Sequence, residues 1–297
     1  MNNQNLDKLI TEVLAIEAEE AKKAGALGFM ARALVQATMP HSKIFKDKDK
    51  AEEANEFKRR NGAFKLTMLA DSDIGLPYGS IPRLLVAWVT TEAVRTKERE
   101  IILGDTLSQF MTQLGLIPTG GRWGSITRLR EQMKRLFAAA ISCTYDDGKQ
   151  WAIKNVQPVS CANLWWNPKS PEQATLFQST ITLGEEFFKE AVTSPIPIDM
   201  RALKALSRSP LALDIYCWLT YRMSYLKQEI IIPWPALQLQ FGSDYAFDTQ
   251  GTRNFKKAFL RELRKVHVFY KDAKIEAEQL GLQLRPSNTH ILLQTKE

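Results

Sequence analysis

Two stretches decide the fold: residues 80–102, SIPRLLVAWVTTEAVRTKEREII, and residues 209–231, SPLALDIYCWLTYRMSYLKQEII. A shift of 129 residues aligns Ser80 with Ser209 and places the two Glu-Ile-Ile endings on each other. In each stretch a serine and an early proline suit the start of a helix, and the apolar ending suits a short strand. The chain therefore contains one helix-and-strand unit twice.

The same elements follow both copies. A short apolar helix ends at Gly115 or Gly242, and a longer, strongly basic helix comes next. A β-hairpin is predicted after each basic helix, over 141–156 around Asp147-Gly148 and over 280–293 around Pro286-Ser287-Asn288. Helix, strand, helix, basic helix and hairpin is the order of a winged helix-turn-helix domain. We therefore expect an α+β fold, mainly helical, of two tandem winged helix-turn-helix domains with an N-terminal helical extension.

The remaining segments give the domain boundaries. Apolar residues recur at spacings of three and four over 6–37, which predicts a helix, and charges crowd over 43–60, which predicts a mobile connector. Alternating strands over 63–69 and 177–183 begin the two units. The expected organisation is an N-terminal helix and charged connector (1–62), a first winged-helix domain for dimerisation, DNA contact or both (63–156), a connector (157–176), and a second winged-helix domain as the main DNA-binding unit (177–297).

The bulk properties narrow the class of protein. The chain has 297 residues, a formal net charge of +7 and a pI near 9.2, which favours polyanionic partners. Its three cysteines, Cys143, Cys161 and Cys217, form no CxxC pair and are typical of a reducing cytosol. The longest apolar stretch, 25–38, is interrupted by Arg32 and is too short for a membrane span. We expect a soluble cytoplasmic protein without membrane association.

The helix predicted over 252–268 has two opposite faces. At about 100° per residue, four cations fall within an arc of about 80°, opposite an apolar face of Phe255, Phe259, Leu263 and Val266. Such an arc without a carboxylate costs self-repulsion unless an anion neutralises it. A helix about 10–12 Å wide fits the major groove of B-DNA, although a solvated surface helix remains the alternative. The four cations are Arg253, Lys257, Arg261 and Arg264.

The basic helix of the first unit is less one-sided. Its apolar stripe runs from Ile126 to Ala140, while Arg128, Gln132 and Arg135 point away from it together with Glu131. Because a carboxylate lies among the cations, this face could contact DNA, a second subunit, or both.

The sequence contains no recognisable set of catalytic residues. The three histidines lie far from one another and from any cysteine, so no metal-binding spacing is present. The glycine-rich stretch 119–125 lacks the Gly-Lys-Ser/Thr ending of a phosphate-binding loop. We therefore expect no metal, no cofactor and no enzymatic activity.

The segments 75–85 (GLPYGSIPRLL) and 118–137 resemble the plasmid RepA-type replication initiators, and the resemblance extends from about Gly25 to the end. That resemblance implies tandem winged helices that bind direct repeats, called iterons, in double-stranded DNA at the plasmid origin. Monomers would open the origin and help load the host replicative helicase, with the host initiator as a further partner. Homodimers, in equilibrium with monomers, would repress the initiator's own gene. The implied location is the bacterial cytoplasm, on DNA.

Carried onto this sequence, the second basic helix would contact the bases, since Arg suits guanine and Asn suits adenine. Residues on its flank and in the wing would contact phosphates, and cations of the first basic helix would add further contacts. The base contacts are Arg253, Asn254, Lys257, Arg261 and Arg264; the phosphate contacts are Lys256, Lys265, Arg285, Asn288 and Thr289; those of the first unit are Arg122, Arg128 and Arg135.

Two alternatives stay open. A dimeric winged-helix transcriptional repressor would use the same fold on an operator, which is usually an inverted repeat rather than a direct one. A nuclease or primase would nick or extend DNA in the presence of Mg²⁺, and we expect neither.

Overall fold

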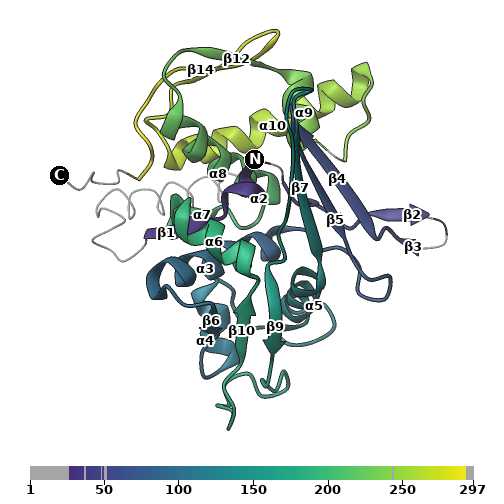
Figure 1. Cartoon of the computed structure of the whole chain (residues 1–297), viewed down its shortest axis with the longest axis vertical. Helices are drawn as coiled ribbons and strands as arrows, with labels where there is room; N and C mark the ends of the chain where they lie inside the picture. Colours follow the sequence, from purple (N-terminus) through teal and green to yellow (C-terminus); the bar gives the residue numbers. More distant parts are fainter. Residues whose placement is uncertain (1–26, 37, 48, 50–51, 243, 292–297) are drawn as a thin grey trace.

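The computed structural model describes residues 27–291 except 37, 48, 50–51 and 243 (Figure 1). Most of the helix predicted over 6–37 lies outside the described residues. The prediction is wrong for the end of this range, which is not one continuous helix: β1 (Leu27–Met30) is a strand, and only α2 (Arg32–Gln36) is helical. Within the described part of the chain, no helix is both long and apolar enough to cross a membrane.

The duplication predicted from the sequence is present in the structure. The first copy consists of α3 (Ser80–Thr96), β6 (Glu100–Ile102), α4 (Leu107–Gln113) and α5 (Ser125–Ala138). The second consists of α8 (Pro210–Tyr225), β12 (Ile230–Pro233), α9 (Trp234–Phe241) and α10 (Thr249–Phe269). Figure 1 shows the first copy in the lower part of the molecule and the second copy above it.

Each copy has a three-stranded antiparallel sheet of the same strand order. In the first, β6 pairs with β10 (Thr180–Leu183), which pairs with β9 (Val159–Asn163). In the second, β12 pairs with β14 (Gly281–Leu284), which pairs with β13 (Ile275–Ala277). In both sheets the last strand of the chain is central, and the strand that follows the first helix lies at an edge.

These sheets correct three expectations. The segment 157–176 is not only a connector, because it contains β9. Residues 177–183 do not open the second unit, because β10 is the central strand of the first sheet. The second hairpin is formed by β13 and β14 around 278–280, not by 280–285 and 289–293. The sequence misled here because the short β13 lies in a polar stretch that lacks a sustained alternation.

A separate four-stranded sheet has the order β4 (Glu56–Asn61), β5 (Phe64–Leu69), β7 (Ala140–Asp146), β8 (Trp151–Asn155). The hairpin predicted around Asp147-Gly148 is confirmed as β7 and β8, but it extends this sheet and does not pair with β6. The charged run 43–60 is no mobile connector, since it contains β2 (Phe45–Asp47), β3 (Glu52–Glu53) and β4. In β4 alternate residues face inward, and Phe57 and Arg59 are buried.

The segment between the two copies contains α6 (Glu185–Thr193), β11 (Ile196–Asp199) and α7 (Met200–Ala205). β11 pairs antiparallel with β1, from Leu27 opposite Asp199 to Met30 opposite Ile196. α2 packs against α8. The amino-terminal part of the described chain is therefore bound to the second half of the molecule.

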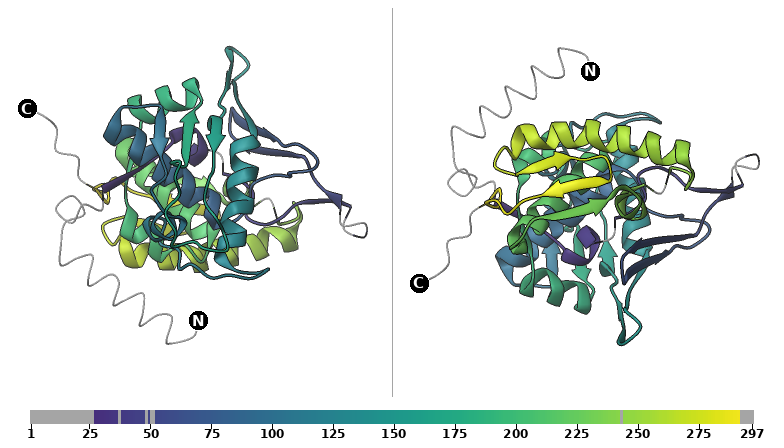
Figure 2. Two further views of the ribbon diagram at one scale, coloured as in Figure 1. Left: turned by 90° about the horizontal axis from the view of Figure 1, so that it is seen from below. Right: turned by 90° about the horizontal axis from the view of Figure 1, so that it is seen from above.

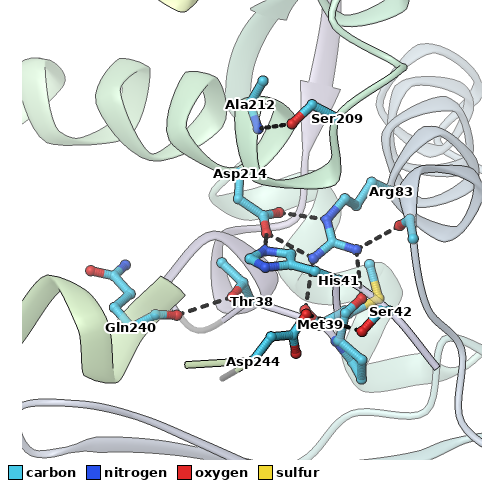
Figure 3. A network of polar contacts seen from close by, with 12 residues as sticks. Thr38, Met39, His41, Ser42, Arg83, Ser209, Ala212, Asp214, Gln240 and Asp244 are labelled. Carbon is cyan, nitrogen blue, oxygen red and sulfur yellow. Dashed lines mark hydrogen bonds and ion pairs between the residues drawn. The ribbon is translucent and has the colours of Figure 1, made fainter. Parts of the chain in front are cut away.

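A buried polar network joins the two copies (Figure 3). The guanidinium of Arg83 in α3 lies 2.7 Å from each carboxylate oxygen of Asp214 in α8. It also donates to the backbone carbonyls of Met39, Pro40 and Gly79. Nε2 of His41 lies 2.7 Å from Oδ2 of Asp214. Because every member has a partner, this network can stay buried where an unpaired charge would be costly.

Candidate nucleic-acid interface

One face of α10 is packed firmly into the protein. Phe255, Phe259 and Val266 are fully buried, and the rings of Phe255 and Phe259 lie 5.6 Å apart beside Phe241 of α9. The carboxylate of Asp248 caps the helix by accepting the amide of Gly251 at 2.6 Å. This packing fixes the rotation of the helix about its axis, and the apolar face predicted from the sequence is confirmed.

The opposite face of α10 presents cations to solvent. Arg253, Lys257 and Arg264 are exposed, and none of them forms an ion pair with a carboxylate in the described part of the chain. Figure 2 shows the helix running along one side of the molecule, where a long ligand could lie against it. Three of the four cations predicted for this face are therefore free to bind an anion.

The fourth cation, Arg261, has a partner that the sequence did not indicate. Its side chain is 64% exposed, and its Nε donates to Oε1 of Glu262 at 2.8 Å. Lys265 donates to the other oxygen of the same carboxylate at 2.7 Å, and the Ser209 side chain is also hydrogen-bonded to it. Glu262 itself is buried. Burial acts to raise the pKa of Glu262, but its hydrogen bonds outweigh that effect and the pKa is lowered.

The predicted phosphate contacts on the flank of α10 and after β14 make more intramolecular contacts than the cations of its exposed face. Lys256 donates to the carbonyl of Glu278 at 3.1 Å, and its ammonium lies 4.5 Å from the centre of the Trp234 ring. Asn254 is exposed, and its Oδ1 accepts from Gln250 at 2.9 Å. Arg285 is bound by Glu229 at 2.9 Å and by Glu276 at 3.4 Å.

Asn288 and Thr289 do not lie in a hairpin, because β14 ends at Leu284. The carbonyl of Asn288 accepts the hydroxyl of Tyr270 at 2.6 Å, and the Thr289 hydroxyl donates to the carbonyl of Ile291 at 2.7 Å. Asn288 keeps an exposed side chain. Their predicted position in a wing is wrong because the hairpin was assigned too far along the chain.

In the first unit, the prediction that Arg135 points outward is wrong. Its side chain is 7% exposed, and its guanidinium binds Glu53 at 2.6 Å and Glu131 at 3.0 Å. Gln132, also expected to point outward, is buried, and its Oε1 accepts the backbone amide of Tyr78 at 2.9 Å. The cause is that two segments lie against this side of α5. Leu76 and Tyr78 contact Arg135 and Gln132, and β3 supplies Glu53. The guanidinium of Arg135 is therefore held by two carboxylates inside the protein, and its predicted outward orientation is wrong.

The other cations of this unit remain at the surface. Arg128 is exposed and, among the described residues, makes no side-chain hydrogen bond or ion pair. Arg122 is exposed in the loop before α5, with its guanidinium 5.0 Å from the centre of the Trp123 ring. The described residues contain no group of three His, Cys, Asp or Glu side chains that could hold a metal ion.

Residues 76–234 match the family described as plasmid-encoded RepA protein, which is more than half of the chain. The chain belongs to this family of plasmid replication initiators. The match confirms the resemblance carried by the segments 75–85 and 118–137. The matched range contains both Arg83 and Asp214. It ends at the first residue of α9, so α10 lies outside it.

Solved structures of similar fold are those of RctB domains 2 and 3. The RctB fragment 155–483 has a TM-score of 0.51 and 11% identity, over 86% of this chain and 97% of the fragment. A selenomethionine derivative of domains 2 and 3 has a TM-score of 0.55 and 11% identity, over 88% of this chain and 99% of that one. No curated protein sequence matches the chain. The likeness to RctB therefore covers most of this chain at the level of the fold.

Proposed function

We propose that this RepA-family initiator binds direct repeats in duplex DNA at a plasmid origin, and that α10 lies in the major groove. The observation that carries the proposal is the exposed cationic face of α10, with Arg253, Lys257 and Arg264 unpaired within the described chain. Its opposite face is held by buried aromatic rings, so the helix that carries the cations need not be ordered when DNA binds. Arginine and asparagine side chains at this face suit the edges of guanine and adenine.

We also infer that each copy is a winged helix-turn-helix unit. The inference is supported by the helix pairs α4–α5 and α9–α10, and by the two three-stranded sheets of equal strand order. In this assignment β9 and β10 form the first wing, and β13 and β14 form the second. The first unit would then extend to Leu183 and would include the four-stranded sheet as an addition.

The family supplies the rest of the proposed mechanism. Monomers in a row on direct repeats would open the adjacent origin DNA and help load the host helicase. Dimers would form through the first unit and repress the initiator's own gene. The exposed cations Arg122 and Arg128 would then touch DNA beside the repeat, and their contacts would be to phosphates.

The test is a titration of the full chain with a labelled duplex that carries one repeat from the DNA beside its gene. Lys257→Ala and Arg264→Ala should each weaken specific binding by about 1–3 kcal/mol where they contact bases. Lys189→Ala is the matched control, because Lys189 is an exposed cation on α6 and away from α10. The logarithm of the affinity should fall with that of the salt concentration, with a slope of about −0.9 per neutralised phosphate.

Two results would contradict the proposal. One is equal affinity of the wild type, Lys257→Ala and Arg264→Ala. The other is a symmetric footprint on an inverted repeat with no direct repeats bound, which would favour the dimeric repressor.

A further inference from the structure

The first turns of α10 carry two exposed amide side chains on the cationic side of the helix. The structure begins α10 at Thr249, before the start predicted from the sequence, so Gln250 belongs to the helix as well. At about 100° per residue, Gln250 falls about 60° and Asn254 about 100° from Arg253, within and at the edge of the arc of cations. Both side chains are exposed. They therefore lie where the duplex would lie in the proposed function.

The two amides are joined by a hydrogen bond. Nε2 of Gln250 donates to Oδ1 of Asn254 at 2.9 Å, across one turn of the helix. Neither side chain has another hydrogen-bond partner among the described residues. Asp248, the carboxylate at the start of the helix, is occupied as its cap by the backbone amide of Gly251. The remaining polar groups of the amide pair are therefore available to a ligand.

The groups that stay free on Asn254 match one base. An amide oxygen accepts two hydrogen bonds and an amide nitrogen donates two, so Oδ1 keeps one free acceptor site beside the free donors of Nδ2. In the major groove adenine offers an acceptor, N7, beside a donor, the N6 amino group. Guanine offers two acceptors there, and one of them would face the oxygen of the amide. Asn254 is therefore complementary to adenine.

Gln250 matters because it holds the amide of Asn254 in one orientation. The last torsion of an asparagine side chain is broad and roughly two-fold, so a free amide can exchange the places of its oxygen and nitrogen. The bond from Gln250 holds Oδ1 on the side of Gln250. Ordering a free side chain on binding costs affinity, and a side chain that is already held avoids part of that cost. Since such a bond adds little to the stability of an exposed helix, its effect should appear in DNA binding.

We propose that Gln250 and Asn254 form one recognition unit for adenine in the duplex repeat. Asn254 contacts N7 and the N6 amino group, and Gln250 is the positioning residue that holds its amide for this contact. The inference rests on the proposed function of α10 and adds to it a determinant of the recognised sequence.

The experiment is a titration of the full chain with labelled duplex repeats in which the adenines are replaced one at a time. 7-Deazaadenine lacks the N7 acceptor, and unsubstituted purine lacks the N6 amino group. At one adenine, each replacement should weaken binding by the wild type about fivefold or more. Asn254→Ala should bind the natural repeat about fivefold or more weakly, and neither replacement should weaken its binding further.

Gln250→Ala tests the positioning role. It should weaken binding to the natural repeat about two- to tenfold, and this loss should disappear when Asn254 is already replaced by alanine. A merely structural role in the helix would give the same loss with either residue at position 254. Gln178→Ala is the matched control, because Gln178 is an exposed amide outside α10. It should leave the affinity and the response to both replacements unchanged.

The outcomes separate this inference from the proposed function. If Lys257→Ala and Arg264→Ala weaken binding but neither replacement affects the wild type at any adenine, the adenine contact is overturned and the duplex interface stands. If the losses of Gln250→Ala and Asn254→Ala add independently, the positioning role is overturned. If none of these four variants changes the affinity, the proposed function fails together with this inference.

Discussion

Arg83 of α3 and Asp214 of α8 form a two-point ion pair, with Nε 2.7 Å from Oδ1 and Nη2 2.7 Å from Oδ2. The two residues come from opposite copies of the repeated unit, and both side chains are buried, 2% and 7% exposed. Three backbone carbonyls accept the other donors of Arg83. A buried charged contact therefore helps to fix the relative position of the two copies.

Removing one partner of this pair should strongly destabilise the protein. Asp214→Asn leaves the guanidinium of Arg83 without its counter-charge, and we expect a loss of about 3–5 kcal/mol in the free energy of unfolding. Urea denaturation followed by circular dichroism measures it. The control is Arg95→Ala, which breaks an exposed pair with Glu92 and should cost at most about 1 kcal/mol. Equal losses in both variants would contradict a special role for the buried pair.

Acid should destabilise the protein before its carboxylates titrate. Burial lowers the pKa of both His41 and His290 below the ordinary value of about 6.5. The unfolded chain therefore binds more protons than the folded one below that value, and stability falls as the pH decreases, by at most about 1.4 kcal/mol per pH unit for each proton. Burial acts to raise the pKa of Asp214, but Arg83 and His41 hold it below its ordinary value, so this carboxyl titrates only in stronger acid.

The measurement is the urea midpoint between about pH 7.5 and about pH 5.5. It should decrease across this range for the wild type and decrease less when His41→Gln and His290→Gln are combined. A midpoint that is constant or higher in acid would show that these histidines are not kept neutral by the fold.

Glu262→Gln should change stability and DNA affinity in opposite directions. The amide cannot neutralise Arg261 and Lys265, so we expect duplex affinity to improve by about 0.5 kcal/mol. The weaker bonds of the buried amide should cost about 1–3 kcal/mol of stability. Glu185→Gln, an exposed carboxylate paired with Lys189, serves as the control for both measurements. Weaker DNA binding by Glu262→Gln would mean that the carboxylate positions Arg261 for the bases.

Arg135 and Arg128 should separate structure from binding within one helix. Arg135→Met leaves Glu131 without its partner and Glu53 with Lys43 alone, and should cost about 1–3 kcal/mol of stability, with little change in duplex affinity of the folded protein. Arg128→Ala should change stability by less than about 0.5 kcal/mol and weaken DNA binding if α5 contacts phosphates. Urea denaturation and a duplex titration of both variants check this pair. If Arg135→Met instead weakened DNA binding and Arg128→Ala did not, Arg135 would be a DNA contact.

The sequence was most informative where one element has a clear period. In α10 the apolar positions recur with the helical period over 21 residues, so the buried positions of Phe255 and Val266 and the exposure of Lys257 were all predictable. The repeat of α3 in α8 was equally visible, because long buried helices keep similar residues at similar positions.

The failures have physical causes that act over long distances. Arg135 pairs with Glu131, one helical turn away, and with Glu53, 82 residues away. A local pattern can show the first of these carboxylates but not the second. In β4 only one face is buried and the other carries Glu56, Lys58 and Arg60, which hid the alternation among charges. Similarly, the first three-stranded sheet contains β9 and β10, which are separated by a long loop that no turn motif marks.

The pairing of β1 with β11 has a consequence for how the chain is made. At roughly 5–20 residues per second, Leu27–Met30 is synthesised about 8–34 s before Ile196–Asp199. During that time the strand has no sheet to join, although α3 to α5 can already collapse around their own core. The start of the described chain therefore closes the structure late in synthesis, and a nascent protein that stalls before residue 199 still exposes an unpaired strand to the quality-control machinery of the cell.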